Sequence, residues 1–430
     1  MKFADCVITD CRQLLTCRGP LPKRGRDLQD IGLLEETTIA SYRGKIVYIG
    51  QKQSFEKAFS LTKDAAVLNA EGLTALPGFV DPHNHLPFAG GREQEFALRL
   101  QGATYPELAA RGMGIQTSVR ETRKASREEL KYLCLSRLDS MLLHGTTTTE
   151  AKSGYGLNKD DEIKQLEALK EADREHPIEI VPTFLGAHEI PPEYRDNKEA
   201  YIRLLIEDII PEIRRRDLAE FFDVFCEEGV YSIEETRRLI RAAKQHGFKI
   251  KIHADEFAPL GGTQLAAEEG ATSADHLMAI TEEGIAALAR SDTAATFLPG
   301  VSFFLMQEKK APARRLIESG AVVALATDFN PGSSMTESMP FILQLAVFTL
   351  GMGIEESINA ATANAAFTLR RHLDVGSLEI GKQMDVILCA EPSYLDLVYH
   401  CGINPVRHVI FIVGAKASRK EINEFNAFIV

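Results

Sequence analysis

The chain is 430 residues long, which exceeds what one small hydrophobic core usually serves, so a large barrel or two domains are expected. Its formal net charge of −12 argues against general binding of nucleic acid, which needs basic patches. The sequence contains neither an apolar run of about 18 residues nor the apolar core of a signal peptide, so no membrane span and no export are expected. Seven scattered cysteines without a Cys-x-x-Cys pair suit a reducing cytoplasm.

Both ends of the chain predict short β-strands separated by turns. The strands expected near the N-terminus are residues 3–9, 38–42 and 45–50, and those near the C-terminus are residues 384–389 and 408–413. Neither end is long enough to form a core of its own. We therefore expect residues 1–70 and 375–430 to combine into one small β-sandwich domain beside a larger domain of residues 71–374.

The middle of the chain repeats a pattern of strand, loop and helix. Helices are expected, for example, at residues 126–144, 160–174 and 233–246. Eight strands are predicted, at residues 79–83, 146–152, 178–185, 222–226, 249–253, 272–276, 294–298 and 322–327. Eight such repeats predict an α/β fold, the (β/α)8 TIM barrel, in which functional side chains gather at the C-terminal ends of the strands.

Histidine and aspartate recur at these strand ends. His83 and His85 are two residues apart, so one strand end directs both imidazoles to the same side. Five of the eleven histidines lie at such positions, namely His83, His85, His188, His253 and His276. With Asp328, the set of His83, His85 and His253 offers three nitrogens and one oxygen, which suits Zn²⁺ or Fe²⁺. Taken singly, Asp328 also suits a helix N-cap and His253 a buried, hydrogen-bonded imidazole.

Several motifs resemble the imidazolonepropionase family of the amidohydrolase superfamily along essentially the whole chain. The most specific are Lys152-Ser-Gly-Tyr-Gly-Leu157 and Thr327-Asp-Phe-Asn-Pro-Gly-Ser-Ser334. The supporting motifs span residues 79–85, 99–105, 223–228, 253–256 and 273–277. The resemblance implies hydrolysis of the ring C–N bond of 4-imidazolone-5-propanoate to N-formimidoyl-L-glutamate. It also implies one divalent metal per subunit, with zinc favoured over iron, and a homodimer.

The resemblance also assigns roles to individual residues. It implies that His83, His85, His253 and Asp328 bind the metal, and that Glu256 is the general acid/base, assisted by His276 and Asp328. The residues expected to hold the substrate are Arg92, Tyr105, Tyr155, His188, Asn330, Gly332 and Ser333. The chemistry agrees, because ring opening needs an activated water, a carboxylate that moves protons and donors for the developing oxyanion.

Plainer roles remain open for some of these residues. Arg92 would also suit a simple ion pair with Glu93 or Glu95, Tyr155 would suit packing, and Gly332-Ser333 would suit a turn. Binuclear amidohydrolases carry a carbamylated lysine on the fourth strand, and this chain has no lysine there. Lys152 lies on the second strand, so we expect it to pair with a carboxylate beneath the rim of the barrel.

The chain departs from the family pattern at three places. Asn84 stands between the two histidines and is expected to face away from the metal. The loop Gly112-Met-Gly-Ile115 differs from a more usual glycine run, and Glu189 is expected to point away from the substrate. Two other functions are considered: a mononuclear deaminase of a cyclic amidine such as cytosine or guanine, and a non-catalytic scaffold of the same fold.

Overall fold

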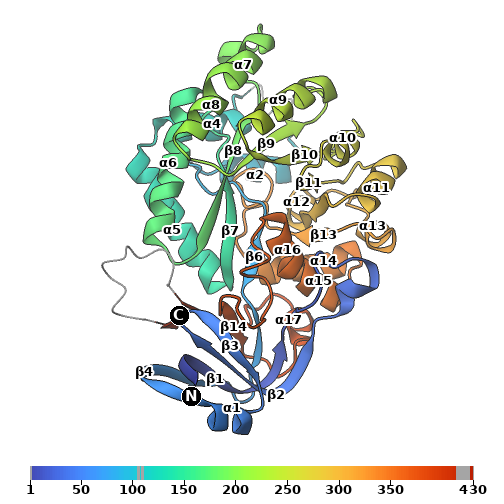
Figure 1. Cartoon of the computed structure of the whole chain (residues 1–430). Coiled ribbons are helices and arrows are strands. Elements are labelled where there is room, and N and C mark those ends of the chain that lie inside the picture. The colour runs from blue at the N-terminus through green and yellow to red at the C-terminus, as the bar shows by residue number, and fades with distance from the viewer. Residues whose placement is uncertain (1, 104–106, 108–110, 413–426, 430) are drawn as a thin grey trace.

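The computed structural model describes residues 2–103, 107, 111–412 and 427–429. Figure 1 displays a barrel of strands surrounded by helices and, at its foot, a second sheet that both ends of the chain enter. None of the described helices is long and apolar enough to cross a membrane.

The barrel is a parallel sheet of eight strands in chain order. Its strands are β6 (Phe79–Asp81), β7 (Thr146–Lys152), β8 (Glu179–Ala187), β9 (Phe221–Cys226), β10 (Lys249–Ala254), β11 (Ser273–His276), β12 (Ala294–Phe297) and β13 (Val323–Leu325). Beyond the last strand, the Asp328 N–H donates to the His83 carbonyl at 2.9 Å and the His85 N–H to the Phe329 carbonyl at 3.0 Å. These bonds join the chain after β13 to the chain after β6. The (β/α)8 prediction is confirmed, and each predicted strand end lies within two residues of the observed one.

Helices cover the outside of the barrel, and their starts follow from the sequence. α5 (Arg127–Leu143) and α9 (Ile233–Gln245) each begin with a serine–glutamate capping box. The other helices on the way to β11 are α2 (Glu93–Leu100), α4 (Ile115–Lys124), α6 (Lys159–Glu175), α7 (Lys198–Leu204), α8 (Ile210–Arg215) and α10 (Gly262–Glu268). After β11 come α11 (Glu282–Ala289), α12 (Pro299–Phe304), α13 (Ala313–Glu318), α14 (Met339–Leu350), α15 (Ile354–Ala361), α16 (Ala363–Thr368) and α17 (Asp396–Tyr399). The predicted helices at residues 126–144, 160–174 and 233–246 correspond to α5, α6 and α9.

The second sheet combines strands from both ends of the chain, as predicted. It contains β1 (Lys2–Leu15), β2 (Leu33–Tyr42), β3 (Lys45–Gly50), β4 (Phe59–Asn69), β5 (Thr74–Pro77), β14 (Val386–Cys389), β15 (Val406–Ile412) and β16 (Ala427–Ile429), with α1 (Lys52–Ala58) beside it. β1 pairs with β4 along its first part and with β5 near its end, so the sheet divides there. A buried apolar cluster that includes Ile8, Ile39, Val386 and Ile410 forms the core of this smaller domain.

The second sheet also fixes the first barrel strand, because β5 runs almost directly into β6. The single residue between them, Gly78, lies against β7. A Cβ on Gly78 would lie 2.2 Å from the Thr147 hydroxyl oxygen, so this close approach requires glycine. β6 therefore enters the barrel from a fixed point and ends two residues before His83.

Candidate active site

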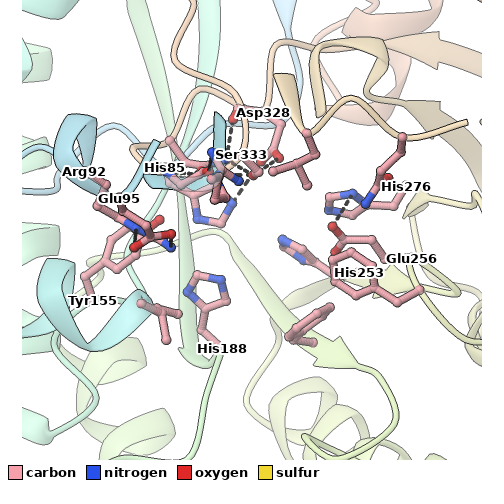
Figure 2. A pocket seen from close by; sticks show the side chains of 18 residues that line it. His85, Arg92, Glu95, Tyr155, His188, His253, Glu256, His276, Asp328 and Ser333 are labelled. Atoms are coloured by element: carbon pink, nitrogen blue, oxygen red, sulfur yellow. Dashed lines mark hydrogen bonds and ion pairs between the residues drawn. The ribbon is translucent and has the colours of Figure 1, made fainter. Parts of the chain in front are cut away.

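The predicted metal ligands meet at the C-terminal end of the barrel. His83 and His85 follow β6, His253 lies in β10 and Asp328 follows β13. The Asp328 carboxylate oxygen Oδ1 lies 3.3 Å from His83 Nε2 and 3.2 Å from His85 Nε2. The rings of His83 and His253 have centroids 4.5 Å apart. All of these side chains are buried, and Figure 2 shows His85, His253 and Asp328 around one central space.

Three atoms at this centre that could bind a metal have no hydrogen bond within the described part of the chain. They are His83 Nε2, His253 Nε2 and Asp328 Oδ1, each buried without a hydrogen bond. Buried polar atoms left in this state are costly, so a site of this kind calls for a ligand. Burial, followed by the Lys152 charge, holds the pKa of His83 well below its usual range, so the ring is neutral and its lone pair is available. The imidazoles of His83, His85 and His253, with the Asp328 carboxylate beside the first two, suit a divalent metal ion.

Two buried carboxylates contact the rings of His83 and His253 on the side away from the cavity. Asp275 Oδ2 lies 2.6 Å from His83 Nδ1, and Asp223 Oδ2 lies 3.0 Å from His253 Nδ1. A carboxylate only accepts, so His83 Nδ1 carries the proton and its Nε2 lone pair faces the centre. Lys152 lies deeper, 2.7 Å from Asp223 and 2.8 Å from Glu150. The prediction that Lys152 pairs with a carboxylate beneath the rim is confirmed.

Glu256 and His276 form a buried pair beside the predicted metal ligands. Glu256 Oε1 lies 3.6 Å from His276 Nδ1, and Figure 2 marks this contact with a dashed line. Burial first, and then the carboxylates of Asp328 and Glu227, raise the pKa of Glu256 well above its usual range. Burial lowers the pKa of His276 to about 3, so this ring is neutral. A raised pKa suits the Glu256 carboxyl group to proton exchange near neutral pH, and a neutral His276 ring suits hydrogen bonding.

His276 and Asp328 have unusual backbone conformations as well. Their φ angles are 81° and 49°, in the left-handed region that non-glycine residues seldom adopt. His276 ends β11 and Asp328 is the third residue after β13, where the chain turns over the rim. Such conformations persist where the surrounding structure holds them, and they concentrate at functional sites.

One cavity of about 400 Å³ is lined by His85, His253, Glu256, His276 and Asp328. The predicted substrate-binding residues that line it are Arg92, Tyr155, His188, Asn330, Gly332 and Ser333. Tyr105, the remaining one, lies outside the described residues. His188 stacks on His85 with ring centroids 5.0 Å apart, and its Nδ1 lies 3.0 Å from the Gly154 carbonyl. That carbonyl accepts the Nδ1 proton, and burial lowers the pKa of His188, so its Nε2 is an acceptor.

Arg92 faces the cavity and is also paired with Glu95. Its Nε and Nη2 donate to the two Glu95 oxygens at 3.0 and 2.5 Å, so the ion pair considered from the sequence does form. The Gly114 N–H also donates to Glu95, at 2.8 Å. A Cβ on Gly332 would lie 2.1 Å from Arg92 Nη1, so the remaining edge of the guanidinium rests against Gly332. The two Nη1 hydrogens and the second Nη2 hydrogen are not used by Glu95 and are left for an anion.

Gly332 and Ser333 form a tight turn around Asn330. The N–H groups of Gly332 and Ser333 both donate to the Asn330 side-chain oxygen, at 2.8 and 2.9 Å. These amides are thus engaged within the turn. The Ser333 hydroxyl donates to Asp328, with the Oγ 3.4 Å from Oδ2, so the turn connects the cavity wall to a predicted metal ligand.

Some residues of the cavity were not singled out from the sequence. They are Glu95, Arg99, Ile115, Phe225, Phe257, Leu305 and Gln307. Arg99 and Phe225 stand inside quoted motifs, but their types alone do not separate a cavity wall from ordinary packing. Glu189 lines a separate cavity of about 610 Å³ together with the loop at Gly112 and Met113. It is not among the residues lining the first cavity, in agreement with the expected outward direction.

Comparisons with known proteins agree with this site. A sequence profile of the amidohydrolase family matches residues 74–412. An imidazolonepropionase of Symbiobacterium thermophilum is 48% identical over 411 residues, covering 95% of this chain and 96% of the relative. One from Geobacillus kaustophilus is 46% identical, covering 97% and 98%. The chain belongs to the imidazolonepropionase family of amidohydrolases, and it is a hydrolase.

Solved structures of lower identity share the fold. An adenosine deaminase from Xanthomonas campestris with bound zinc superimposes with a TM-score of 0.67 at 18% identity, covering 95% of this chain and 92% of that one. A 5-methylcytosine deaminase from Klebsiella pneumoniae gives 0.71 at 16% identity, covering 94% and 96%. At such identities the likeness establishes the amidohydrolase barrel alone.

Proposed function

We propose that this protein hydrolyses 4-imidazolone-5-propanoate to N-formimidoyl-L-glutamate. The observation that carries the proposal is one cavity that joins a divalent-metal donor set, the Glu256–His276 pair and Arg92. Its volume of about 400 Å³ suits a small molecule. In the reaction the hydroxyl of water goes to the ring carbonyl carbon, the C–N bond breaks and the ring nitrogen takes a proton.

The metal we propose is one zinc ion per chain, held by His83, His85, His253 and Asp328. Zinc is favoured because three imidazoles and a carboxylate suit it, although the same donors also accept iron. When bound, a divalent metal lowers the pKa of water from 15.7 to about 7 and polarises a carbonyl oxygen. The chain itself supplies the orientation of the ligands, through Asp275 and Asp223.

Glu256 is the proton carrier in this scheme. It takes a proton from the attacking water and returns it to the leaving ring nitrogen. Burial raises its pKa, so the carboxyl group retains the proton long enough to deliver it. His276 lies next to it as a neutral ring and is placed to donate a hydrogen bond to the developing oxyanion. His188 Nε2 accepts, which suits a ring N–H of the substrate.

The opposite side of the cavity holds the carboxylate of the substrate. Arg92 offers both Nη1 hydrogens and the second Nη2 hydrogen, because Glu95 accepts only the Nε hydrogen and one Nη2 hydrogen. Arg99 lies nearby and donates from Nη2 to the Gly332 carbonyl at 3.2 Å. Two guanidinium groups and one carboxylate leave a net positive charge at this end, which suits a monoanionic propionate chain.

Replacing Arg92 with alanine is expected to raise KM by about 10- to 100-fold with a smaller effect on kcat. The lost interactions are hydrogen bonds between charged groups, worth about 1.5–3 kcal/mol each. Steady-state kinetics on the imidazolone substrate measure this. Arg195→Ala is the matched control, because Arg195 lines the separate cavity and KM should not change. An unchanged KM in Arg92→Ala would mean that the propionate binds elsewhere.

Gly332→Ala tests the same contact from the opposite side. The added carbon would lie 2.1 Å from Arg92 Nη1, so the guanidinium must move and KM should rise by up to about tenfold. Gly353→Ala is the control for adding a methyl group, because nothing lies closer than 3.4 Å there. If Gly332→Ala bound substrate as well as the unmodified protein, Arg92 would not rest against Gly332 during binding.

The decisive experiment is a direct assay of the zinc-loaded protein. The substrate is generated fresh from urocanate, and the loss of its ultraviolet absorbance is followed with and without a chelator. Chelator-sensitive acceleration with N-formimidoyl-L-glutamate as the product would support the proposal. No acceleration with the metal loaded would overturn it, and cytosine and guanine would then be tested for ammonia release.

A further inference from the structure

The interior of the barrel directly beneath the metal ligands is ionic. TIM-barrel interiors are usually filled by branched apolar side chains, and burying charge carries a large desolvation cost. Here five charged side chains are completely buried: Glu150 and Lys152 from β7, Asp223 from β9, Lys251 from β10 and Asp275 from β11. They are called the buried ionic network below. The proposed mechanism gives a part only to Asp223 and Asp275.

The network connects two metal ligands without a break. Asp223 Oδ2 lies 3.0 Å from His253 Nδ1 and 2.7 Å from Lys152 Nζ. At the other end, Asp275 Oδ2 lies 2.6 Å from His83 Nδ1 and 3.7 Å from Lys251 Nζ.

Glu150 is the centre of the network. Its Oε2 lies 2.8 Å from Lys152 Nζ and 3.2 Å from Lys251 Nζ, so one oxygen joins both halves. Its other oxygen accepts a hydrogen bond from the Thr183 hydroxyl at 2.5 Å. Lys251 also donates to the carbonyl of Pro82, the residue before His83. Glu150 is therefore held on both sides by partners that themselves reach the ligating histidines.

The formal charges of the network and Asp328, counted as one set, are those a divalent cation would balance. In this set three network carboxylates and the Asp328 carboxylate face the two network ammonium groups, which leaves two negative charges uncompensated. A divalent metal bound by His83, His85, His253 and Asp328 cancels them. We propose that the buried ionic network, centred on Glu150, is a positioning device that sets the charge of the site and the orientation of His83 and His253 for a divalent ion. Glu150 acts through other residues and does not touch the metal.

The test is zinc affinity, measured by competition with a chromophoric chelator. Glu150→Gln keeps the shape of the side chain but removes one negative charge and weakens the hold on both lysines. We expect the zinc dissociation constant to rise by about 10- to 100-fold, as is typical when a partner of a metal ligand is lost. A dissociation constant within about twofold of the unmodified protein would overturn the proposal, because a purely structural role predicts no change in affinity.

Two further variants make the result unambiguous. Glu356→Gln is the matched control, because Glu356 is equally buried but pairs with Arg314 on the outer helices and should leave zinc affinity unchanged. Thr183→Val removes only the hydroxyl that donates to Glu150, and we expect a smaller rise of about tenfold. If Glu150→Gln does not fold, Thr183→Val decides, and unchanged affinity there overturns the proposal. An unmodified protein that binds no zinc overturns the metal site as well.

Discussion

Replacing Glu256 with glutamine is expected to lower kcat by about 10²- to 10⁴-fold, the usual contribution of general acid–base catalysis. Glutamine keeps the shape of the side chain and its contact with His276, but it cannot take a proton from water or return one to the leaving nitrogen. Glu256 does not belong to the metal donor set, so zinc content should not change. The measurement is kcat together with zinc per chain by elemental analysis.

The control for this substitution lies at the same end of the barrel. Glu228 is an exposed glutamate that follows β9, and Glu228→Gln should retain full activity. Full activity in Glu256→Gln would remove the proton-carrier role. A loss of zinc alongside the loss of activity would instead assign Glu256 to the metal site.

Strand positions and the ends of the strands were predictable because the barrel repeats a simple pattern. Apolar runs separated by helices located β6 to β13, and the (β/α)8 geometry then placed His83, His253 and Asp328 at one end. The convergence of these side chains needed only the rule that parallel strands end on the same side. The i, i+3 spacing of Arg92 and Glu95 likewise allowed the ion pair that the structure contains.

The buried ionic network was harder to predict. Lys251 precedes His253 by two residues, so strand alternation places both on one face, and Glu150 relates to Lys152 in the same way. What the sequence could not supply is which side chains meet across different strands. Lys251 meets Glu150 across the barrel interior from a strand that is not its neighbour, and that depends on how the barrel closes and tilts.

The contacts of Asn330 in the cavity wall were also hard to predict from the sequence. Asn330 is expected to hold the substrate and lines the cavity, and its side-chain oxygen also accepts from the Gly332 and Ser333 amides, which forms the turn against which Arg92 rests. A turn residue and a binding residue have the same signature in sequence, since both are polar and follow a strand. Only the three-dimensional arrangement separates a group that contacts the substrate from one that shapes the wall.

Removing the metal should abolish activity and also destabilise the fold. Without the ion, three buried atoms have no hydrogen-bond partner among the described residues: His83 Nε2, His253 Nε2 and Asp328 Oδ1. Loss of the several kcal/mol that a metal contributes to the transition state corresponds to a rate loss of about 10³-fold or more. Zinc at about 100 times its dissociation constant should stabilise the protein by about 2.7 kcal/mol. The measurement is activity and Tm after chelator dialysis and on stepwise addition of zinc.

Magnesium provides the matched control for that titration. It prefers six oxygen ligands in octahedral geometry, whereas this site offers three imidazole nitrogens and one carboxylate. Magnesium should therefore restore neither activity nor Tm, while zinc restores both in parallel and at the same concentration. If protein proved free of metal by elemental analysis retained its original rate, the buried donor set would not serve catalysis. The partnerless nitrogens of His83 and His253 would then need another explanation.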